Sequence, residues 1–264
     1  GIMNSSYFSR AQRTHHDILH DDLATGIGTK QQLSPHSILS PTITDDWRII
    51  QGSDAKIYSI GLDPQTTIML AGHAADACCW LDPVSLKWVT TSSYPDGLPT
   101  AADGMNMNGR INELAERLWT PRLDISMYTN PNKDEKRRQF NYLPKDDILH
   151  TPTANTLVIE LALDMQKTEK LGEDITPDIM LLQLTTISPK ANSDIIESAE
   201  QEDMYLGINQ DLGFLMEQLN RRIGKSNYQI LLVGRPIKGY SAQTLATAGI
   251  AVQTFNVDRA AALT

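Results

Sequence analysis

The second half of the chain has the clearest pattern of apolar positions. Residues 153–171 place leucines and a methionine close to one helical face, and Gly172 follows as a helix stop. The apolar run 178–185 (DIMLLQLT) has the length of a strand that is covered on both faces. From Met204 to Ile223, apolar residues recur every three or four positions. This half therefore predicts a helix, a strand and a second long helix.

Three shorter segments continue the alternation. The run 229–233 (QILLV) predicts another buried strand, 241–248 predicts a short helix, and 251–255 (AVQTF) predicts a final strand. Helices and strands that alternate in this way are typical of a mostly parallel sheet with helices on both faces. The sequence therefore predicts an α/β fold.

The beginning of the chain is less regular. Its first thirty residues are polar and predict loops and a short hairpin. Ser40 and Pro41 place a capping hydroxyl before a first-turn proline. A helix is therefore expected to reach Ile50 and to stop near Gly52.

Between these regions, short runs predict further elements. The runs 56–62 (KIYSIGL) and 67–71 (TIMLA) predict buried strands, and the β-rich run 87–91 (KWVTT) predicts a third. Residues 105–119 have helical spacing. The proline-punctuated stretch 121–152 has little periodic hydrophobicity, so we expect an irregular excursion or insertion there.

Composition and charge narrow the range of possible functions. The chain has 264 residues, of which 41% are hydrophobic and 21% charged, as is ordinary for a soluble globular protein. The net charge of −9 argues against nucleic-acid binding, and the mixed-sign run 133–138 (KDEKRR) predicts an exposed loop. No apolar stretch approaches the ~20 residues that span a bilayer. Cys78 and Cys79 are adjacent, so no disulfide is expected between them.

The loops that follow the predicted strands are the natural place to look for chemistry, because crevices form at the carboxyl ends of parallel strands. The loops 63–65, 185–192 and 234–236 contain no histidine, no cysteine and one carboxylate. Divalent metals prefer several Asp, Glu or His ligands, so these loops do not predict a metal site. No GxSxG, GxGxxG or Walker sequence occurs in the chain.

Two groups of histidines are weaker candidates. His15, His16 and His20 lie among three aspartates, but the HExxH arrangement is missing, so solvated loop residues are favoured over a metal site. His73 precedes Asp76 by three positions and could form an acid/base pair. The small residues around His73 favour an internal hydrogen bond instead.

The segment 57–94 (IYSIGLDPQTTIMLAGHAADACCWLDPVSLKWVTTSSY) is distinctive enough to suggest a family. It resembles the secreted, phosphate-irrepressible bacterial alkaline phosphatases, close to the nucleotide pyrophosphatase/phosphodiesterase branch. Residues 33–39, 42–46, 169–174, 202–224 and 258–263 also resemble that family, so the similarity covers almost the whole chain. The resemblance implies one alkaline-phosphatase-like domain over residues 1–264, with an incomplete core, and a periplasmic or extracellular location.

Members of that family are metal-dependent phosphoesterases with a threonine or serine nucleophile and two zinc ions. The resemblance implies that the nucleophile segment lies upstream of this chain and a late histidine ligand beyond its end. The family's Asp-x-x-x-His metal motif falls here on Ser188 and Asn192, and its Asp-His motif falls on Arg235 and Pro236. Serine, asparagine and proline are poor zinc ligands, and Arg235 would place a positive charge beside the metals.

The family's Lys-x-Arg, which contacts the substrate phosphate, falls on Asp63 and Gln65. This exchange removes the charge-assisted phosphate clamp. The sequence therefore predicts a pseudophosphatase that binds no metal cofactor and acts as a binding or scaffolding module for an unknown protein or small anion.

Two alternatives remain open. The chain could belong to an active phosphoesterase that uses zinc, with ligands from other segments or in a different register. It could also bind an anion or a sugar at the old site through Arg235 and Lys190.

Overall fold

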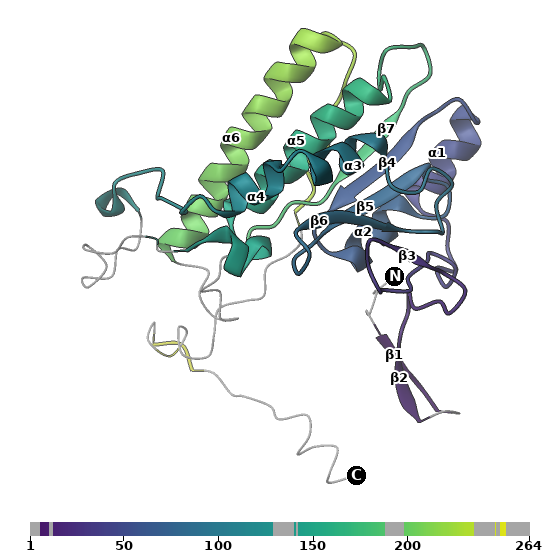
Figure 1. The fold of residues 1–264 in the computed structure, drawn as a ribbon, viewed down its shortest axis with the longest axis horizontal. Coiled ribbons are helices and arrows are strands. Elements are labelled where there is room, and N and C mark those ends of the chain that lie inside the picture. Colours follow the sequence, from purple (N-terminus) through teal and green to yellow (C-terminus); the bar gives the residue numbers. More distant parts are fainter. Residues whose placement is uncertain are drawn as a thin grey trace.

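The computed structural model describes residues 6–10, 13–128, 140, 142–187, 198–234, 246 and 249–251 (Figure 1). Its main sheet has five strands in the order β3-β6-β5-β4-β7. They are β3 (Gly26–Ile27), β4 (Ile57–Gly61), β5 (Ala77–Asp82), β6 (Lys87–Thr91) and β7 (Ile179–Leu182). β4 is parallel to β5 and β7, whereas β6 is antiparallel to β5 and β3.

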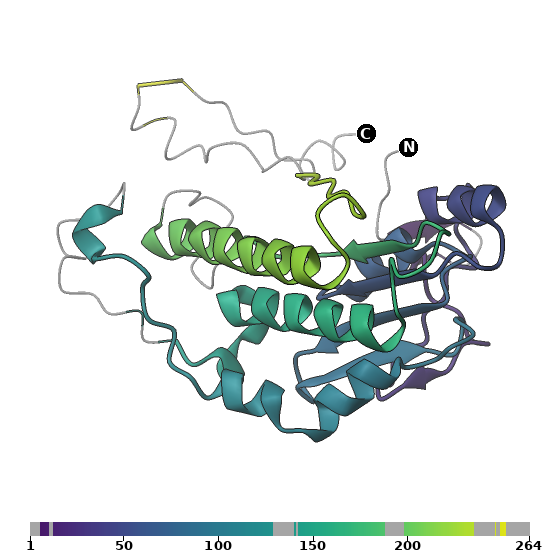
Figure 2. The ribbon, with the colours of Figure 1, turned by 90° about the horizontal axis from the view of Figure 1, so that it is seen from above.

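Helices cover both faces of this sheet (Figure 2). They are α1 (Ile43–Gln51), α2 (Pro64–Ala71), α3 (Thr100–Met107), α4 (Arg110–Ala115), α5 (Pro152–Thr168) and α6 (Ala199–Arg222). One face packs on α3, α4 and α5 through side chains such as Ile60 and Leu157. The other face packs on α1 and α2 through Ile57 and Ile68. α6 lies beside α5. The predicted α/β fold is confirmed.

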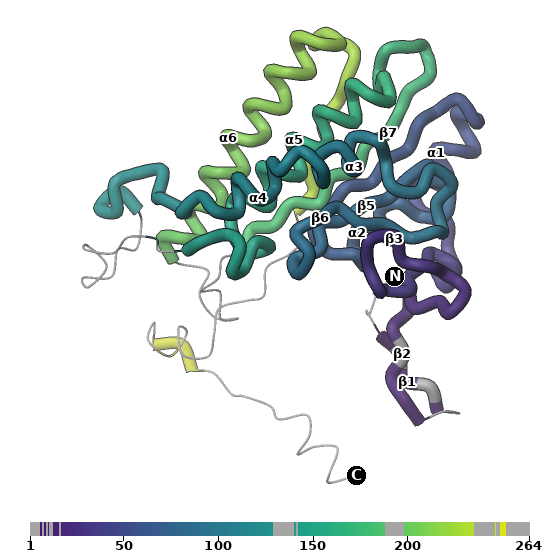
Figure 3. The backbone as a smooth tube through the Cα atoms, in the orientation of Figure 1, coloured from purple at the N-terminus to yellow at the C-terminus, as the bar shows by residue number. Residues whose placement is uncertain are grey.

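The remaining elements are short. A hairpin of β1 (Ser6–Ser9) and β2 (Thr14–Asp17) extends from the body of the molecule (Figure 3), which confirms the predicted hairpin. The described part of the stretch 121–152 contains the 3-10 helices η1 (Ile125–Met127), η3 (Pro144–Asp146) and η4 (Ile148–His150). That this stretch is an insertion stays a prediction.

Successive side chains along each strand point alternately into the two cores, as a pleated backbone requires. Ile60 and Cys79 belong to the core under α5, whereas Ile57 and Cys78 belong to the core over α2. The adjacent cysteines therefore point to opposite faces of β5. Both thiols are free and buried, which confirms that they form no disulfide with each other.

The prediction of a strand at 67–71 is wrong, because these residues form the second half of α2. Asp63 caps this helix and Pro64 occupies its first turn, which are both helix-start features. A short apolar run is compatible with a buried strand and with a buried helix. Here the cap and the proline decide in favour of the helix.

Two predicted helices differ in detail. The helix expected after Ser40 begins at Ile43, and its cap is Thr42, which forms a capping box with Asp45. The helix expected over 105–119 is divided into α3 and α4 at Gly109, whose backbone φ is +77°. That left-handed conformation cannot continue a helix.

The long elements of the second half are confirmed as α5, β7 and α6, but β7 is half-buried rather than fully covered. The predicted strand at 229–233 is wrong, since these residues form no strand and Leu231, Leu232 and Val233 are largely exposed. A strand needs a hydrogen-bonded neighbour. Within the described chain, β7 is the edge of the sheet and nothing pairs beyond it.

Some predictions fall on parts that the structure does not describe. The run 133–138 lies outside the described residues, as do most of 241–248 and all of 252–255. Within the described ranges, no helix combines the length and the apolar character needed to cross a bilayer.

Asp203 anchors the irregular stretch to α6. Its carboxylate is fully buried and accepts hydrogen bonds from Trp119 Nε1 (2.7 Å) and Tyr128 Oη (2.6 Å). It also accepts from the backbone N–H (2.8 Å) and Nη1 (2.7 Å) of Arg122. A buried carboxylate with this many donors is satisfied, but removing its charge leaves the partly buried guanidinium of Arg122 without its charged partner.

We expect Asp203→Asn to lower the free energy of unfolding by about 3 kcal/mol, because it breaks a buried ion pair. Urea denaturation measures this change. The exposed pair of Glu217 and Arg221 is the control, and Glu217→Gln should cost less than about 0.5 kcal/mol. Equal losses in the two variants would contradict the role assigned to Asp203.

Asp211 lies between α5 and α6, where Thr156 Oγ1 lies 3.2 Å from its carboxylate. Burial raises the pKa of Asp211 to about 6. A raised carboxyl pKa means that ionisation destabilises the folded state as the pH rises from about 4 to about 6. We expect Asp211→Asn to be more stable than the parent chain at pH 7, by roughly 1–2 kcal/mol, and equally stable below pH 4. Thermal denaturation across this pH range measures the difference.

Candidate functional site at the end of the central strand

The carboxyl end of β4 lies between the ends of β5 and β7, where an α/β sheet forms its crevice. The structure places Asp63 and Gln65 at this point, in the loop and first turn that lead into α2. The other three predicted site residues, Ser188, Asn192 and Arg235, lie outside the described residues. That these five positions form one site stays a prediction.

Asp63 is engaged as the N-cap of α2. Its Oδ2 accepts hydrogen bonds from the backbone N–H of Thr66 (2.8 Å) and from Thr66 Oγ1 (2.6 Å). The beginning of a helix attracts negative charge, and here the protein supplies that charge itself. A phosphate would have to displace this carboxylate to reach the same N–H groups.

Gln183 closes the loop from the other side, and sequence reasoning missed it. Its Oε1 accepts hydrogen bonds from the backbone N–H groups of Leu62 and Asp63, both at 2.8 Å. The approach is so close that a Cβ at Gly61 would lie 2.7 Å from this oxygen and 2.0 Å from Thr67 Oγ1. The one available indication in the sequence is that Gln183 is the only polar residue in the run 179–184.

Gln65 points away from this loop toward the N-terminal hairpin. Its Nε2 donates a hydrogen bond of 2.7 Å to Oδ2 of Asp17. The other oxygen of Asp17 accepts from the backbone N–H of Leu19, whose side chain is buried in the core over α2. Gln65 therefore ties α2 to the last residue of the hairpin.

Zinc does not fit the residues that the structure describes at this strand end. The carboxylate of Asp63 and the amide oxygen of Gln183 are both taken up by backbone N–H groups. Zinc sites in proteins use several Cys, His, Asp or Glu side chains. Across the described ranges, no three such side chains are grouped in a way that would hold a metal ion.

The AGHAADA motif lies at the other end of the strands, beside the amino ends of β4 and β5, and has a structural role. Asp45 Oδ1 accepts hydrogen bonds from the backbone N–H groups of His73 (2.8 Å) and Ala74 (2.9 Å). Asp45 Oδ2 lies 3.0 Å from His73 Nδ1. A Cβ at Gly72 would lie 2.0 Å from Thr42 Oγ1, so the glycine permits this close approach. The favoured interpretation of His73 as an internal hydrogen-bonding residue is confirmed.

Asp76, the suggested acid/base partner of His73, binds elsewhere. Its two oxygens accept from Arg48 Nη2 (2.6 Å) and from the backbone N–H of Ile57 (2.7 Å). Arg48 also donates to the backbone oxygen of Ala74. The motif therefore joins α1 to the beginning of β4, and the proposed His73–Asp76 pair is wrong.

Two of the N-terminal histidines, His15 and His20, contact different groups. The ring of His15 lies 5.2 Å from that of Phe8, and His20 Nε2 lies 3.0 Å from the exposed carboxylate of Asp22. These contacts are those of surface residues on a hairpin and the turn after it.

Three curated proteins are similar in sequence. A calcium-transporting ATPase of Myroides odoratus is 27% identical over 255 residues, which cover 88% of this chain and 46% of that protein. Alkaline phosphatase PafA of Elizabethkingia meningoseptica is 26% identical over 80% of this chain and 43% of its own length. Alkaline phosphatase PhoV of Synechococcus elongatus is 24% identical over 88% of this chain and 46% of its own length. No protein-family model matches the chain.

Solved structures of an alkaline phosphatase resemble the fold of this chain. The crystal structure of wild-type PafA matches with a TM-score of 0.75 and 24% identity, over 85% of this chain and 47% of that chain. A PafA mutant matches with a TM-score of 0.69 and 23% identity. The fold is thus that of an alkaline phosphatase. The sequence relatives and the solved structures support the predicted assignment to the alkaline phosphatase superfamily, and the chain spans about half the length of these relatives.

The hydrogen bonds around Asp45 predict an acid-sensitive contribution to stability. Burial raises the pKa of Asp45, but hydrogen bonds from His73 and Thr42 outweigh this effect and lower it from 3.8 to about 2. A lowered carboxyl pKa stabilises the folded state above pH 4, and this stabilisation is lost as the pH falls toward 2.

We expect Asp45→Asn to lower the free energy of unfolding at pH 7 by about 1–2 kcal/mol and to lose less stability than the parent chain between pH 4 and pH 2. Urea denaturation at several pH values measures both effects. Asp46→Asn, at an exposed position on the same turn, is the matched control. A pH dependence that is unchanged in Asp45→Asn would refute this assignment.

Proposed function

We propose that this chain is an alkaline-phosphatase-like binding or scaffolding module that does not hydrolyse phosphoesters. The observation that carries the proposal is the hydrogen bonding of the loop after β4. Gln183 occupies the N–H groups of Leu62 and Asp63, and the carboxylate of Asp63 occupies the beginning of α2. The groups that would have to meet a phosphate are thus already engaged within the chain.

The charge of this strand end supports the same conclusion. Phosphoryl transfer depends on positive charge, from metal ions or from Lys and Arg, placed around the reacting phosphate. The described residues instead place the carboxylate of Asp63 at the beginning of α2, and the Gln65 side chain is hydrogen-bonded to the carboxylate of Asp17. Like charges repel, so a phosphate dianion is disfavoured here.

The sequence of the remaining strand-end positions gives independent support. Ser188 and Asn192 offer neutral oxygens, and Arg235 offers a fixed positive charge. Zinc pairs are held by carboxylate and imidazole ligands. We therefore propose that the chain binds no zinc pair and that its partner is a protein or a small anion.

An active phosphoesterase is the second candidate. It is favoured by the similarity to PafA and PhoV, of which this chain spans less than half, so ligands from further segments would complete a site. That enzyme would require zinc. For either candidate we propose a periplasmic or extracellular location, as the resemblance to secreted alkaline phosphatases implies.

Metal content and turnover distinguish the two candidates. We expect elemental analysis of protein purified without chelator to find less than one zinc ion per chain. Aryl phosphate monoesters and diesters should be hydrolysed no faster than in buffer that contains zinc alone, with PafA as the positive control. Two tightly held zinc ions per chain would overturn the proposal.

A variant separates true activity from contamination. If turnover is seen, Arg235→Ala should change its rate when the activity belongs to this chain and should leave it unchanged when it belongs to a contaminant. A turnover rate that changes in Arg235→Ala would also refute the proposed loss of hydrolysis.

A further inference from the structure

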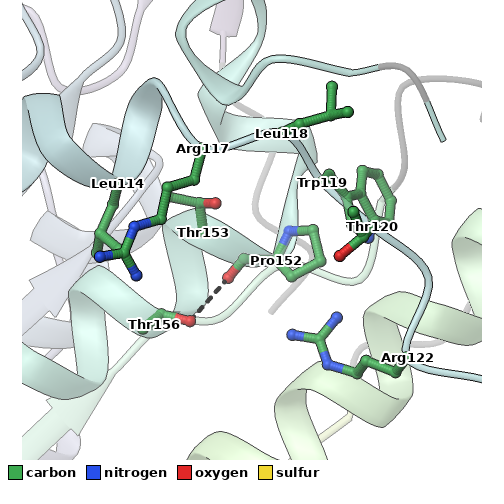
Figure 4. Close-up of a pocket in the computed structure, with 9 residues that line it drawn as sticks. All are labelled: Leu114, Arg117, Leu118, Trp119, Thr120, Arg122, Pro152, Thr153 and Thr156. Atoms are coloured by element: carbon green, nitrogen blue, oxygen red, sulfur yellow. Dashed lines mark hydrogen bonds between the residues drawn. The ribbon is translucent and has the colours of Figure 1, made fainter.

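A cavity of about 260 Å³ lies beside the first turn of α5 (Figure 4). It is lined by Leu114, Arg117, Leu118, Trp119, Thr120, Arg122, Pro152, Thr153 and Thr156. None of these residues belongs to the loop after β4. Two of the lining residues are cationic and none is acidic. Each arginine is paired with a carboxylate that does not line the cavity, Arg117 with Glu113 and Arg122 with Asp203, so the cavity presents guanidinium donors rather than a net positive charge.

Arg122 is held in place by groups outside the cavity. Its Nη1 donates to Asp203 at 2.7 Å and its Nε donates to Gln210 at 2.9 Å. Its Nη2 has no hydrogen-bond partner among the described residues. Gly207 on α6 leaves room for this group, since a Cβ there would lie 3.0 Å from Nη2. A donor that is already fixed loses little conformational freedom when a ligand binds.

Arg117 reaches the cavity from the other side. In Figure 4 the two guanidinium groups flank Pro152 and Thr156, which belong to the first turns of α5. Arg117 forms an ion pair with Glu113 one helical turn earlier, and its side chain is 62% exposed. Exposed ion pairs contribute little to stability, so Arg117 can turn toward a ligand at small cost.

The wall between the arginines is partly apolar. Leu118 and Trp119 line one part of the cavity, and the hydroxyls of Thr120 and Thr153 lie among the lining residues. Guanidinium groups form strong, charge-assisted hydrogen bonds with carboxylate and phosphate oxygens. Small-molecule sites commonly combine such polar groups with apolar walls.

We propose that this cavity binds a small organic oxyanion. Its carboxylate or phosphate group lies between Arg117 and Arg122, and its apolar body packs against Leu118 and Trp119. The proposal goes beyond the loss of hydrolysis and does not depend on it, because the cavity shares no residue with the loop after β4.

Isothermal titration calorimetry on the full chain at low salt tests the proposal. The probes are benzoate and phenylphosphonate, with benzamide as the uncharged counterpart and inorganic phosphate as the probe without an apolar body. We expect both aromatic anions to bind, and we expect added salt to weaken their binding. Benzamide should not bind, and inorganic phosphate should bind more weakly than phenylphosphonate. No binding of either aromatic anion, or equal binding of benzamide and benzoate, would overturn it.

Variants locate the binding. Arg117→Gln should lower the affinity for both aromatic anions at least about tenfold, as expected for the loss of a charge-assisted hydrogen bond. Arg221→Gln is the matched control, because Arg221 forms the same type of exposed ion pair, with Glu217, but does not line the cavity. Equal affinities in these two variants would place the anions elsewhere and refute the proposal.

A second variant tests Arg122 without removing its ion pair. Gly207→Ala adds a methyl group that crowds Nη2 of Arg122 and should also weaken phenylphosphonate, while circular dichroism shows that the fold is kept. Unchanged affinity in Gly207→Ala would refute the role of Arg122.

Discussion

The burial of the central strand β4 is the constraint on which the rest of the structure depends. All of its residues are buried, and it is paired with parallel neighbours on both sides. A buried backbone N–H without an acceptor costs about as much as a lost hydrogen bond, so the ends of this strand need acceptors. At the amino end, Asp178 accepts from the N–H of Lys56 and Asp76 accepts from that of Ile57. The AGHAADA motif is part of this arrangement, which explains its distinctive sequence without a catalytic role.

The same constraint acts at the carboxyl end, where the crevice of the fold lies. There the acceptor is Gln183, a neutral side chain, and the backbone N–H of Thr66 in the first turn of α2 is met by Asp63. A loop whose donors are satisfied by its own chain is stable without a bound phosphate or metal. The fold of an alkaline phosphatase is retained, but a fold does not imply a function, which depends on the side chains at the strand ends.

Charge is distributed in a way that agrees with this interpretation. Asp45 and Asp203 each accept several hydrogen bonds from within the chain, so part of the negative charge stabilises loops and helix ends. Beside α5, Arg117 and Arg122 line a cavity with no carboxylate among its lining residues, and their ion-pair partners Glu113 and Asp203 lie outside that lining. The anion site that we propose is therefore not at the end of β4.

The sequence by itself determined the α/β class and the elements β4, β6, α5 and α6. Each of these elements packs against the core, and the apolar run or helical periodicity that such packing requires is a local pattern in the sequence. It also located Asp63 and Gln65 next to a strand end. Only the tertiary structure decided that Gln183 closes the loop after β4, because its partner Leu62 is 121 positions away in the chain. It likewise decided that 67–71 is helical and that 229–233 is unpaired, since a short apolar run takes its conformation from the cap before it or the strand beside it.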